Sequence, residues 1–473
     1  MSSITPPITP IIYQLGPDFY DEVTPAQFPK QILRYLNSKA TDSASQSDHP
    51  LKKIPHENFW NFKPLENNIQ KPLALRYHGH QFRHYNPDIG DGRGFLYSQF
   101  QYKNEWFDLG TKGSGQTPYS RQGDGRLTLK GAVREALATE MLSFYGLFCS
   151  ETACVYETGE NLNRNDEPSP TRSAVLTRLT RGHIRIGTFQ RLAYFNQFDQ
   201  IKKLTVYVLE NYYSDCLKNL NSEYDQVHRL FQCVSQRLAE QAAQLMVSGF
   251  VHGVLNSDNI NITGEIFDFG PYRFLPKYDP NFTAAYFDHS GLYSFGRQPE
   301  TLLWNLAQLG LSLEKAYPDF KMKPYIDSFE QLFHEEFQTS FQNKLNVRFN
   351  HENDGEKAVG LFYKTLSEVS ICYELAFFSL HTAQVPTNPV FKDPSVVTFL
   401  NHPEMKELKK IIENGAVLDA TVLSNDYFKS AKPETLLIDE VEMIWKPITE
   451  NDDWSLFEQK LQSLRKFKNL YKL

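Results

Sequence analysis

The chain has 473 residues, of which 41% are hydrophobic and 22% are charged, and it carries a net charge of −7 with a pI near 6.0. This composition is ordinary for a globular protein of two or three domains, and the negative balance gives no reason to expect nucleic acid or an anionic membrane as a partner. The N-terminal residues lack a basic region followed by an apolar stretch, and no apolar run reaches the roughly 18 residues of a membrane helix. Five scattered cysteines without metal-ligand spacing are typical of a protein in the reducing cytoplasm. We expect the protein to be cytoplasmic and monomeric, without a membrane partner.

The first predicted elements are strands. Small polar residues at 38–53 predict a flexible connection, so we expect the folded part to begin near Ile54 and assign 1–53 to an N-terminal segment and linker. From Phe95 to Thr111, alternating aromatic residues around a Lys-Asn pair predict a β-hairpin. Lys112 lies just beyond its second strand.

A helix and a further strand follow the hairpin. Apolar residues recur every three or four positions from Leu127 to Tyr145 and predict an amphipathic helix that contains Glu135. After a polar loop, the residues SAVLTRLT predict a strand with Arg178 near its end, and Arg185 follows it. We assign residues 54–190 to a strand-rich N-lobe.

The second half of the chain is predicted to be mostly helical. A long helix is predicted from Asp225 to Gly249, and a polar loop then leads into EIFDFG, which predicts a short strand. Further helices are predicted at Glu300–Leu311, Tyr325–Lys344, Glu356–Leu380, Glu404–Glu413 and Trp454–Lys466. Strands first and helices afterwards predict a two-lobed α+β fold around a cleft. We assign 191–400 to the helical C-lobe and 401–473 to a C-terminal helical extension.

Five residues follow the order in which a protein kinase carries its ATP-binding groups. Lys112, Glu135, His252, Asn259 and Asp268 correspond in turn to the strand lysine, the helix glutamate, the catalytic loop and the metal-binding D-F-G. The interval from His252 to Asn259 matches H-R-D-x-x-x-x-N, and a literal D-F-G begins at Asp268. Each residue alone has an ordinary structural explanation, such as a surface charge or an Asx turn. Together they predict a protein-kinase-like fold.

These residue types suit a nucleotide with a metal ion. The Lys112 ammonium can hold ATP phosphates if a carboxylate such as that of Glu135 fixes its flexible stem. Mg²⁺ prefers hard oxygen ligands, which Asn259 and Asp268 supply together with phosphate oxygens. We therefore expect ATP as a substrate and Mg²⁺ or Mn²⁺ as the metal.

One position departs from the kinase pattern. Val254 stands where H-R-D has its aspartate, and a valine side chain can neither accept a proton nor orient a hydroxyl. Asp258 is the nearest carboxylate that could replace it, so we assign Asp258 the role of general base, with a purely structural role as the alternative. We expect His252 to organise the loop rather than to take part in catalysis.

Glycines and arginines stand in place of the usual glycine-rich loop. The segment IGDGRG at 89–94 offers backbone N–H groups and the guanidinium of Arg93, and a second Gly-Asp-Gly turn follows at 123–125. Either turn alone could be structural, and its aspartate would repel phosphate unless a cation offsets it. Arg178 and Arg185 would bind a terminal phosphate if both reach one pocket.

Eight ordered blocks of residues carry a family resemblance. They are YHGHQF (77–82), NPDIGDGRG (86–94), KGSGQTPYSRQGDGR (112–126), REALATE (134–140), VLTRLTRGHIRIG (175–187), GFVHGVLNSDN (249–259), FDFGPYRFL (267–275) and DHSGLYSFGRQP (288–299). Through these blocks the chain resembles the selenoprotein O family, whose members are pseudokinase-like protein adenylyltransferases, over roughly Tyr77 to Leu306.

The resemblance implies how ATP is bound and used. In that family ATP lies in a flipped orientation, with its γ-phosphate buried and its α-phosphate presented to an acceptor hydroxyl, so AMP is transferred to Ser, Thr or Tyr of a protein and pyrophosphate leaves. It implies that Asp258 is the base and that Asn259 and Asp268 hold the metal. The residues that it implies for nucleotide binding are Gly90, Gly92, Arg93, Lys112, Asp124, Gly125, Arg178, Arg185 and Asp268, with Glu135 as the ion-pair partner of the lysine.

Further functions stay open from the sequence. A kinase-like phosphotransferase shares the lysine, the asparagine and D-F-G, although Val254 and the arginine pair weigh against it. A catalytically inactive nucleotide-binding scaffold is a second candidate. A UMP transferase that uses Mn²⁺ is a third, since nothing in the sequence indicates which nucleobase is recognised. The expected partners are proteins modified on hydroxyl side chains.

Overall fold

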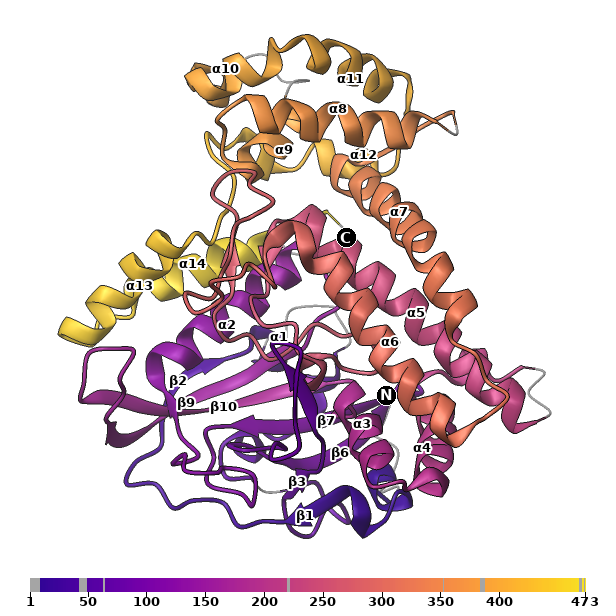
Figure 1. Cartoon of the computed structure of the whole chain (residues 1–473). Coiled ribbons are helices and arrows are strands. Elements are labelled where there is room, and N and C mark those ends of the chain that lie inside the picture. Colours follow the sequence, from indigo (N-terminus) through magenta and orange to yellow (C-terminus); the bar gives the residue numbers. More distant parts are fainter. Residues whose placement is uncertain are drawn as a thin grey trace.

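A large antiparallel sheet is the base of the fold in the computed structural model, which describes residues 9–41, 49–62, 64–218, 222–351, 353–382, 388–467, 470–471 and 473. Its strands pair in the order β1-β3-β6-β7-β10-β9-β2, and the short β8 pairs with β10 (Figure 1). In chain order they are β1 (Tyr20–Glu22), β2 (Ile32–Leu36), β3 (Leu73–Leu75), β6 (Leu96–Tyr102), β7 (Glu105–Lys112), β8 (Leu127–Thr128), β9 (Glu151–Leu162) and β10 (Thr171–Thr180). Three two-stranded pairs are β4 (Gly79–Gln81) with β5 (His84–Asn86), β11 (Phe250–Val251) with β12 (Arg273–Phe274), and β13 (Val347–Arg348) with β14 (Ala416–Val417).

The hairpin predicted between Phe95 and Thr111 lies inside this sheet as β6 and β7. Lys103 and Asn104 join the two strands, and their φ values of 49° and 66° give the left-handed pair of residues that a two-residue hairpin turn requires. The hairpin prediction is therefore confirmed. Lys112 is the last residue of β7, and its side chain is buried.

Residues before Ile54 belong to the sheet rather than to a linker. β1 and β2 form its two edges, pairing with β3 and β9, and the preceding Ile11 and Ile12 are buried. The expectation that the folded part begins near Ile54 is therefore wrong. These strands are too short for an alternating pattern, and their pairing partners lie far away in the chain. In the predicted connection at 38–53, α1 (Ser38–Thr41) and a 3₁₀ turn are observed, and residues 42–48 lie outside the described residues.

One long helix lies between β8 and β9, and helices make up most of the described chain after β10. They are α2 (Leu129–Tyr145), α3 (Ile186–Tyr194), α4 (Phe198–Tyr212), α5 (Glu223–Ser248), α6 (Gln298–Ala316), α7 (Lys323–Leu345), α8 (Asp354–Glu368), α9 (Tyr373–Thr382), α10 (Pro394–Leu400), α11 (Pro403–Asn414), α12 (Ala420–Leu423), α13 (Ile438–Asn451) and α14 (Ser455–Lys466). α8 to α12 gather at the far end of α7 (Figure 1). The prediction of a mixed fold, with a large sheet from the first part of the chain and many helices, is confirmed.

Two predicted elements differ from the observed ones. The helix predicted from Glu356 to Leu380 is two helices, α8 and α9, because Val369 adopts an extended backbone and Tyr373 N–H donates to the Pro276 carbonyl instead of continuing the helix. The strand predicted in EIFDFG is reduced to one bridge between Ile266 and Cys149.

The last two helices pack against α2. Thr128 caps the start of α2 by accepting from Gly131 N–H at 3.1 Å, and the left-handed Gly146 ends the helix. Arg465 on α14 contacts Glu140 on α2 at 2.7 Å, and the two helices lie side by side in Figure 1. The end of the chain is therefore tied to the helix that carries Glu135.

In the part of the chain that the structure describes, no helix is both long and apolar enough to cross a bilayer.

A buried ion pair joins α7 to α9. The Lys344 ammonium, which is 0% exposed, donates to Glu374 Oε2 at 2.6 Å and to the Val247 carbonyl at 3.1 Å. Its nitrogen also lies 4.1 Å from the ring centroid of Phe377. Burial lowers the pKa of Lys344, while the Glu374 carboxylate opposes that shift. The lysine charge therefore depends on its carboxylate partner.

Replacing Glu374 by alanine leaves the Lys344 charge buried without its carboxylate. We expect Glu374→Ala to lower the free energy of unfolding by about 3–5 kcal/mol, the usual cost of breaking a buried pair. Urea denaturation measures the difference. A Lys344→Met, Glu374→Leu double variant is the control, because removing both charges costs less than removing one; an equal or larger loss in the double variant would contradict this explanation.

His381 on α9 gives the fold a pH dependence. Its Nε2 lies 2.6 Å from the Lys344 carbonyl, and burial, helped by the Lys344 charge, lowers the pKa of His381 to about 4. An unfolded histidine titrates near 6.5, so the stabilisation from the neutral imidazole is complete above about pH 6.5 and is lost as the pH falls toward 4. Over that range, urea denaturation should show a steeper loss of unfolding free energy in the natural protein than in His381→Gln. Equal slopes for the two proteins would contradict the role of His381.

Candidate active site

One cavity of about 900 Å³ gathers nearly all of the predicted site residues. Its walls come from the sheet, from the loops at 89–95 and 119–126, and from the loops that follow α5. The predicted residues on these walls are Gly90, Gly92, Arg93, Lys112, Asp124, Gly125, Arg178, Arg185, Asp258, Asn259 and Asp268. Glu135 lies behind the wall, buried on α2.

Glu135 holds two of the cations in the cavity. Lys112 donates to Glu135 Oε2 at 2.6 Å, and Arg178 Nη2 donates to Oε1 at 3.0 Å. The two cations stand side by side because β10 pairs with β7, with Arg178 opposite Gly110. All three charged side chains are buried, so the structure brings the predicted lysine and glutamate together and adds an arginine to them.

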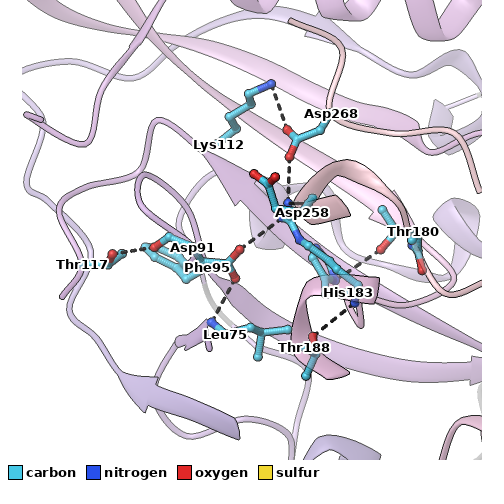
Figure 2. A network of polar contacts seen from close by, with 12 residues as sticks. Leu75, Asp91, Phe95, Lys112, Thr117, Thr180, His183, Thr188, Asp258 and Asp268 are labelled. Atoms are coloured by element: carbon cyan, nitrogen blue, oxygen red, sulfur yellow. Dashed lines mark hydrogen bonds and ion pairs between the residues drawn. The ribbon is translucent and has the colours of Figure 1, made fainter. Parts of the chain in front are cut away.

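Asp268 is the meeting point of three cations. Lys112 Nζ lies 3.2 Å from Oδ1 of Asp268, a contact that Figure 2 shows. Nη2 of Arg178 contacts Oδ1, and Nη1 of Arg185 contacts Oδ2, each at 3.1 Å. Burial raises the pKa of Asp268, but these positive charges outweigh it and hold the pKa well below its usual range. The φ of 65° at Asp268 also explains why EIFDFG does not continue as a strand.

Arg185 is anchored to the loop at 252–259, which is the predicted catalytic loop, and to the first glycine-rich turn. Its Nη1 donates to the Asp258 carbonyl at 2.7 Å, and its Nη2 contacts Asp91 Oδ1 at 3.2 Å. The ring centroid of Tyr77 lies 4.3 Å from the guanidinium carbon. Among the described residues, the buried Nε groups of Arg178 and Arg185 have no hydrogen-bond partner. A buried donor without an acceptor is costly, and an anionic ligand in this cavity would supply the missing acceptors.

In each glycine-rich turn, an arginine pairs with the aspartate and offsets its negative charge. Asp91 is paired with Arg185 and also accepts from Leu75 N–H at 3.0 Å, and Asp124 contacts Arg164 at 2.9 Å. The repulsion of phosphate that these aspartates would otherwise cause is therefore reduced.

The glycines of both turns are required by packing. A Cβ on Gly90 would lie 2.5 Å from the Tyr119 ring. Gly125 has a φ of 68°, and a Cβ there would lie 2.2 Å from the Gly115 carbonyl oxygen. The loops at 89–95 and 119–126 are thereby packed together as one wall of the cavity.

Asp258 has the surroundings of a base. Burial raises its pKa to about 6, although the Arg185 charge opposes the shift. In the described part of the chain its Oδ1 has no hydrogen-bond partner, and its Oδ2 lies 3.4 Å from Gln81 Nε2. By contrast, His252 lies outside the cavity wall, with its Nε2 held 2.9 Å from the Phe267 carbonyl. That contact suits a residue that organises the loop.

Asn259 and Asp268 fit a divalent metal only if phosphate is also present. Asn259 donates its amide to the Val254 carbonyl at 2.9 Å, so the amide oxygen is the group left to bind a cation. One carboxylate and one amide oxygen are ligand types that Mg²⁺ accepts. Both oxygens of Asp268 already contact cations, so a metal would require negative phosphate charge beside it. Among the described residues, no group of three or more His, Cys, Asp or Glu side chains is arranged to hold a metal.

The β4–β5 hairpin supports the catalytic loop, a role for which no local sequence signal exists. His80 N–H donates to Ser257 Oγ at 2.7 Å, and Phe82 N–H donates to Asn256 Oδ1 at 3.0 Å. In the sequence these residues stand out only as the block YHGHQF. No periodicity or chemical motif relates them to a loop about 175 positions later.

Comparisons with known proteins define the class to which this site belongs. A protein named protein nucleotidyltransferase YdiU, from Synechocystis sp., is 40% identical to this chain over 96% of this chain and 97% of its own length. Proteins of the same name from Trichormus variabilis and Trichodesmium erythraeum are 39% and 38% identical over 96% of this chain and over 95% and 97% of their own lengths. The protein is therefore a nucleotidyltransferase. A family model described as protein adenylyltransferase SelO matches residues 4–465, and the chain belongs to that family, which confirms the resemblance carried by the eight blocks.

The two arginines that contact Asp268 are expected to carry much of the affinity for a nucleotide. A hydrogen bond to a charged group contributes about 1.5–3 kcal/mol, so Arg178→Ala and Arg185→Ala should each weaken ATP binding by about 10–100-fold. Isothermal titration calorimetry measures the change. Arg181→Ala is the matched control, since Arg181 lies between them in the chain but contacts Glu265 outside this cavity. An equal loss of affinity in all three variants would contradict the assignment.

Proposed function

We propose that the cavity binds ATP in the flipped orientation and transfers AMP to a hydroxyl group of a protein substrate, with release of pyrophosphate. The observation that carries the proposal is the convergence of three buried cations, Lys112, Arg178 and Arg185, on one carboxylate at the wall of the cavity. Three fixed cations suit the β- and γ-phosphates, which carry most of the negative charge of ATP. If these phosphates occupy the deep end, the α-phosphate lies nearer to the mouth and to the acceptor.

In the proposed reaction Asp258 is the general base. Its raised pKa and its unpartnered Oδ1 support this role, because a buried carboxylate is a better proton acceptor than an exposed one and is still ionised at neutral pH. The acceptor oxygen attacks the α-phosphorus while its proton passes to Asp258. The bond from the α-phosphorus to the bridging oxygen of the β-phosphate breaks, and pyrophosphate leaves with that electron pair.

The cations of the cavity stabilise the charge that develops on pyrophosphate. Lys112 and Arg178 are held by Glu135 before ATP arrives, so they need little reorganisation during the reaction. Asn259 and Asp268 would hold Mg²⁺ or Mn²⁺, which neutralises phosphate charge when it is bound. The nucleotide contacts of Gly90, Gly92, Arg93, Asp124 and Gly125 belong to the same proposal, and their position on the cavity wall supports it.

We also propose that the chain has the two lobes of a protein kinase, with the large sheet and α2 in the N-lobe, which then includes β1 and β2 as well as residues 54–190, with 191–400 in the C-lobe and with 401–473 as an extension. The contact between Lys112 and Glu135, from a strand and a helix, supports a kinase-like N-lobe. Phosphoryl transfer is the less favoured function, because Val254 replaces the aspartate that orients the hydroxyl in a kinase.

The position of the transferred label distinguishes the two reactions. The protein is incubated with Mg²⁺ and ATP labelled at either the α- or the γ-phosphate, and labelled proteins are separated by electrophoresis. We expect label from the α position only. Transfer from the γ position would contradict AMP transfer, and stronger transfer from α-labelled UTP with Mn²⁺ would replace AMP by UMP.

The role of Asp258 has its own test. Asp258→Asn keeps the size of the side chain but cannot take up the proton, so we expect AMP transfer to fall by about 10²–10⁴-fold. ATP binding, measured by calorimetry, should change little. Asp319→Asn, at an exposed aspartate outside the cavity, is the control. Full activity in Asp258→Asn would remove the assignment.

A further inference from the structure

An aromatic surface continues the wall of the cavity that lies next to the catalytic loop. It consists of Phe82, Tyr286 and Phe287, which we call the aromatic ledge. Phe82 and Phe287 line the cavity, with ring centroids 5.8 Å apart, and the Tyr286 ring lies 5.1 Å from that of Phe287. Tyr286 is 77% exposed, the highest value among the described large apolar side chains, and Phe287 is 42% exposed. Adjacent exposed rings at the edge of a cavity are typical of a binding surface.

The backbone beneath the aromatic ledge is fixed to the catalytic loop. Gly253 has a φ of 85°, and a Cβ there would lie 3.0 Å from the Cβ of Ala284. On the other side, Asp288 accepts from Leu292 N–H at 2.9 Å and from Tyr293 N–H at 2.8 Å. Phe82 also packs on the Tyr293 ring, with centroids 5.0 Å apart. The exposed rings therefore stand on an ordered support, which lowers the entropy cost of binding a partner.

Val254 adds a further apolar side chain to this cavity, and Gln81, which precedes Phe82 in the chain, contacts Asp258 at 3.4 Å. Val254 lies on the cavity wall with Phe82 and Phe287, at the position where a kinase has its catalytic aspartate. A charged side chain at this place would have to lose water when an apolar group packs against it, which is costly. Valine at this position avoids that cost.

We propose that the aromatic ledge, together with Val254, binds the acceptor polypeptide through an apolar side chain next to the hydroxyl that receives AMP. This inference rests on the proposed AMP transfer, because it assumes that the acceptor approaches Asp258. The ledge continues the wall of the cavity that Asp258 also lines, and for this reason we infer that the partner bound by the ledge is the acceptor. The cations around Asp268 suit phosphate. The ledge instead offers aromatic rings, against which an aliphatic or aromatic side chain buries the most apolar surface.

Two pools of synthetic peptides test the proposal. Each pool is an equal mixture of peptides with a central Ser, Thr or Tyr, flanked by leucine in one pool and by aspartate in the other. Transfer is followed with α-labelled ATP, and ATP affinity is measured by calorimetry. Tyr286→Ala and Phe287→Ala are compared with Tyr286→Phe, which keeps the ring, and with Tyr224→Ala, a 52% exposed tyrosine outside the cavity.

We expect the leucine-flanked pool to be the better substrate. The two alanine variants should raise its KM by about tenfold, the effect of losing an aromatic anchor, and leave ATP affinity unchanged within about twofold. Tyr286→Phe, which keeps the ring, should raise the KM less than Tyr286→Ala does, and Tyr224→Ala, outside the ledge, should behave like the natural protein. Equal use of the two pools, unchanged KM in the alanine variants, or a loss of ATP affinity in them would overturn the proposal; the last result would mean that the rings bind the nucleotide.

The experiment distinguishes an error in the ledge proposal from an error in the AMP-transfer proposal. If the natural protein transfers label to neither pool, the proposed AMP transfer to these hydroxyls is contradicted. The ledge is then judged by binding of the fluorescein-labelled leucine-flanked pool, measured by anisotropy with ATP and Mg²⁺ present. Tighter binding to the natural protein than to Tyr286→Ala supports the ledge, and equal binding overturns it.

Discussion

The balance of buried charge around Asp268 is the constraint on which the site depends. Three cations, Lys112, Arg178 and Arg185, face three carboxylates, those of Glu135, Asp91 and Asp268. Because these charges are equal in number, the cluster tolerates burial. Phosphates add negative charge, so their binding requires either a divalent cation or a change in the contacts of Asp268. The same balance explains why Asp268 can be both the resting partner of the cations and a metal ligand in the proposed function.

The fold holds this cluster from several distant parts of the chain. Adjacent strands supply Lys112 and Arg178, α2 supplies Glu135, and the start of α3 supplies Arg185. α13 and α14 pack on α2, so residues near the end of the chain help to position a residue at the back of the cavity. The site is thus a product of tertiary contacts rather than of one loop.

The sequence was informative where chemistry imposes a fixed order. That Lys112, Glu135, Asn259 and Asp268 gather around one cavity could be predicted because they follow the order of elements in a protein kinase, and a hairpin with a Lys-Asn turn is a local pattern. β1 and β2 could not be predicted, because strands of three and five residues are fixed by partners such as Leu75 and Tyr156 that lie far away in the chain. The packing of α14 on α2 and the support of the catalytic loop by β4–β5 are likewise non-local, and no single-sequence pattern records them.

A crystal structure with a non-hydrolysable ATP analogue and Mg²⁺ tests the central claim most directly, because it shows which groups the buried cations hold once phosphate is present. The proposed binding mode predicts β- and γ-phosphate oxygens within hydrogen-bond distance of Lys112, Arg178 and Arg185, with the metal beside Asn259 and Asp268 and the α-phosphate on the side of Asp258. Phosphates bound elsewhere, with the three cations still on Asp268 alone, would contradict it.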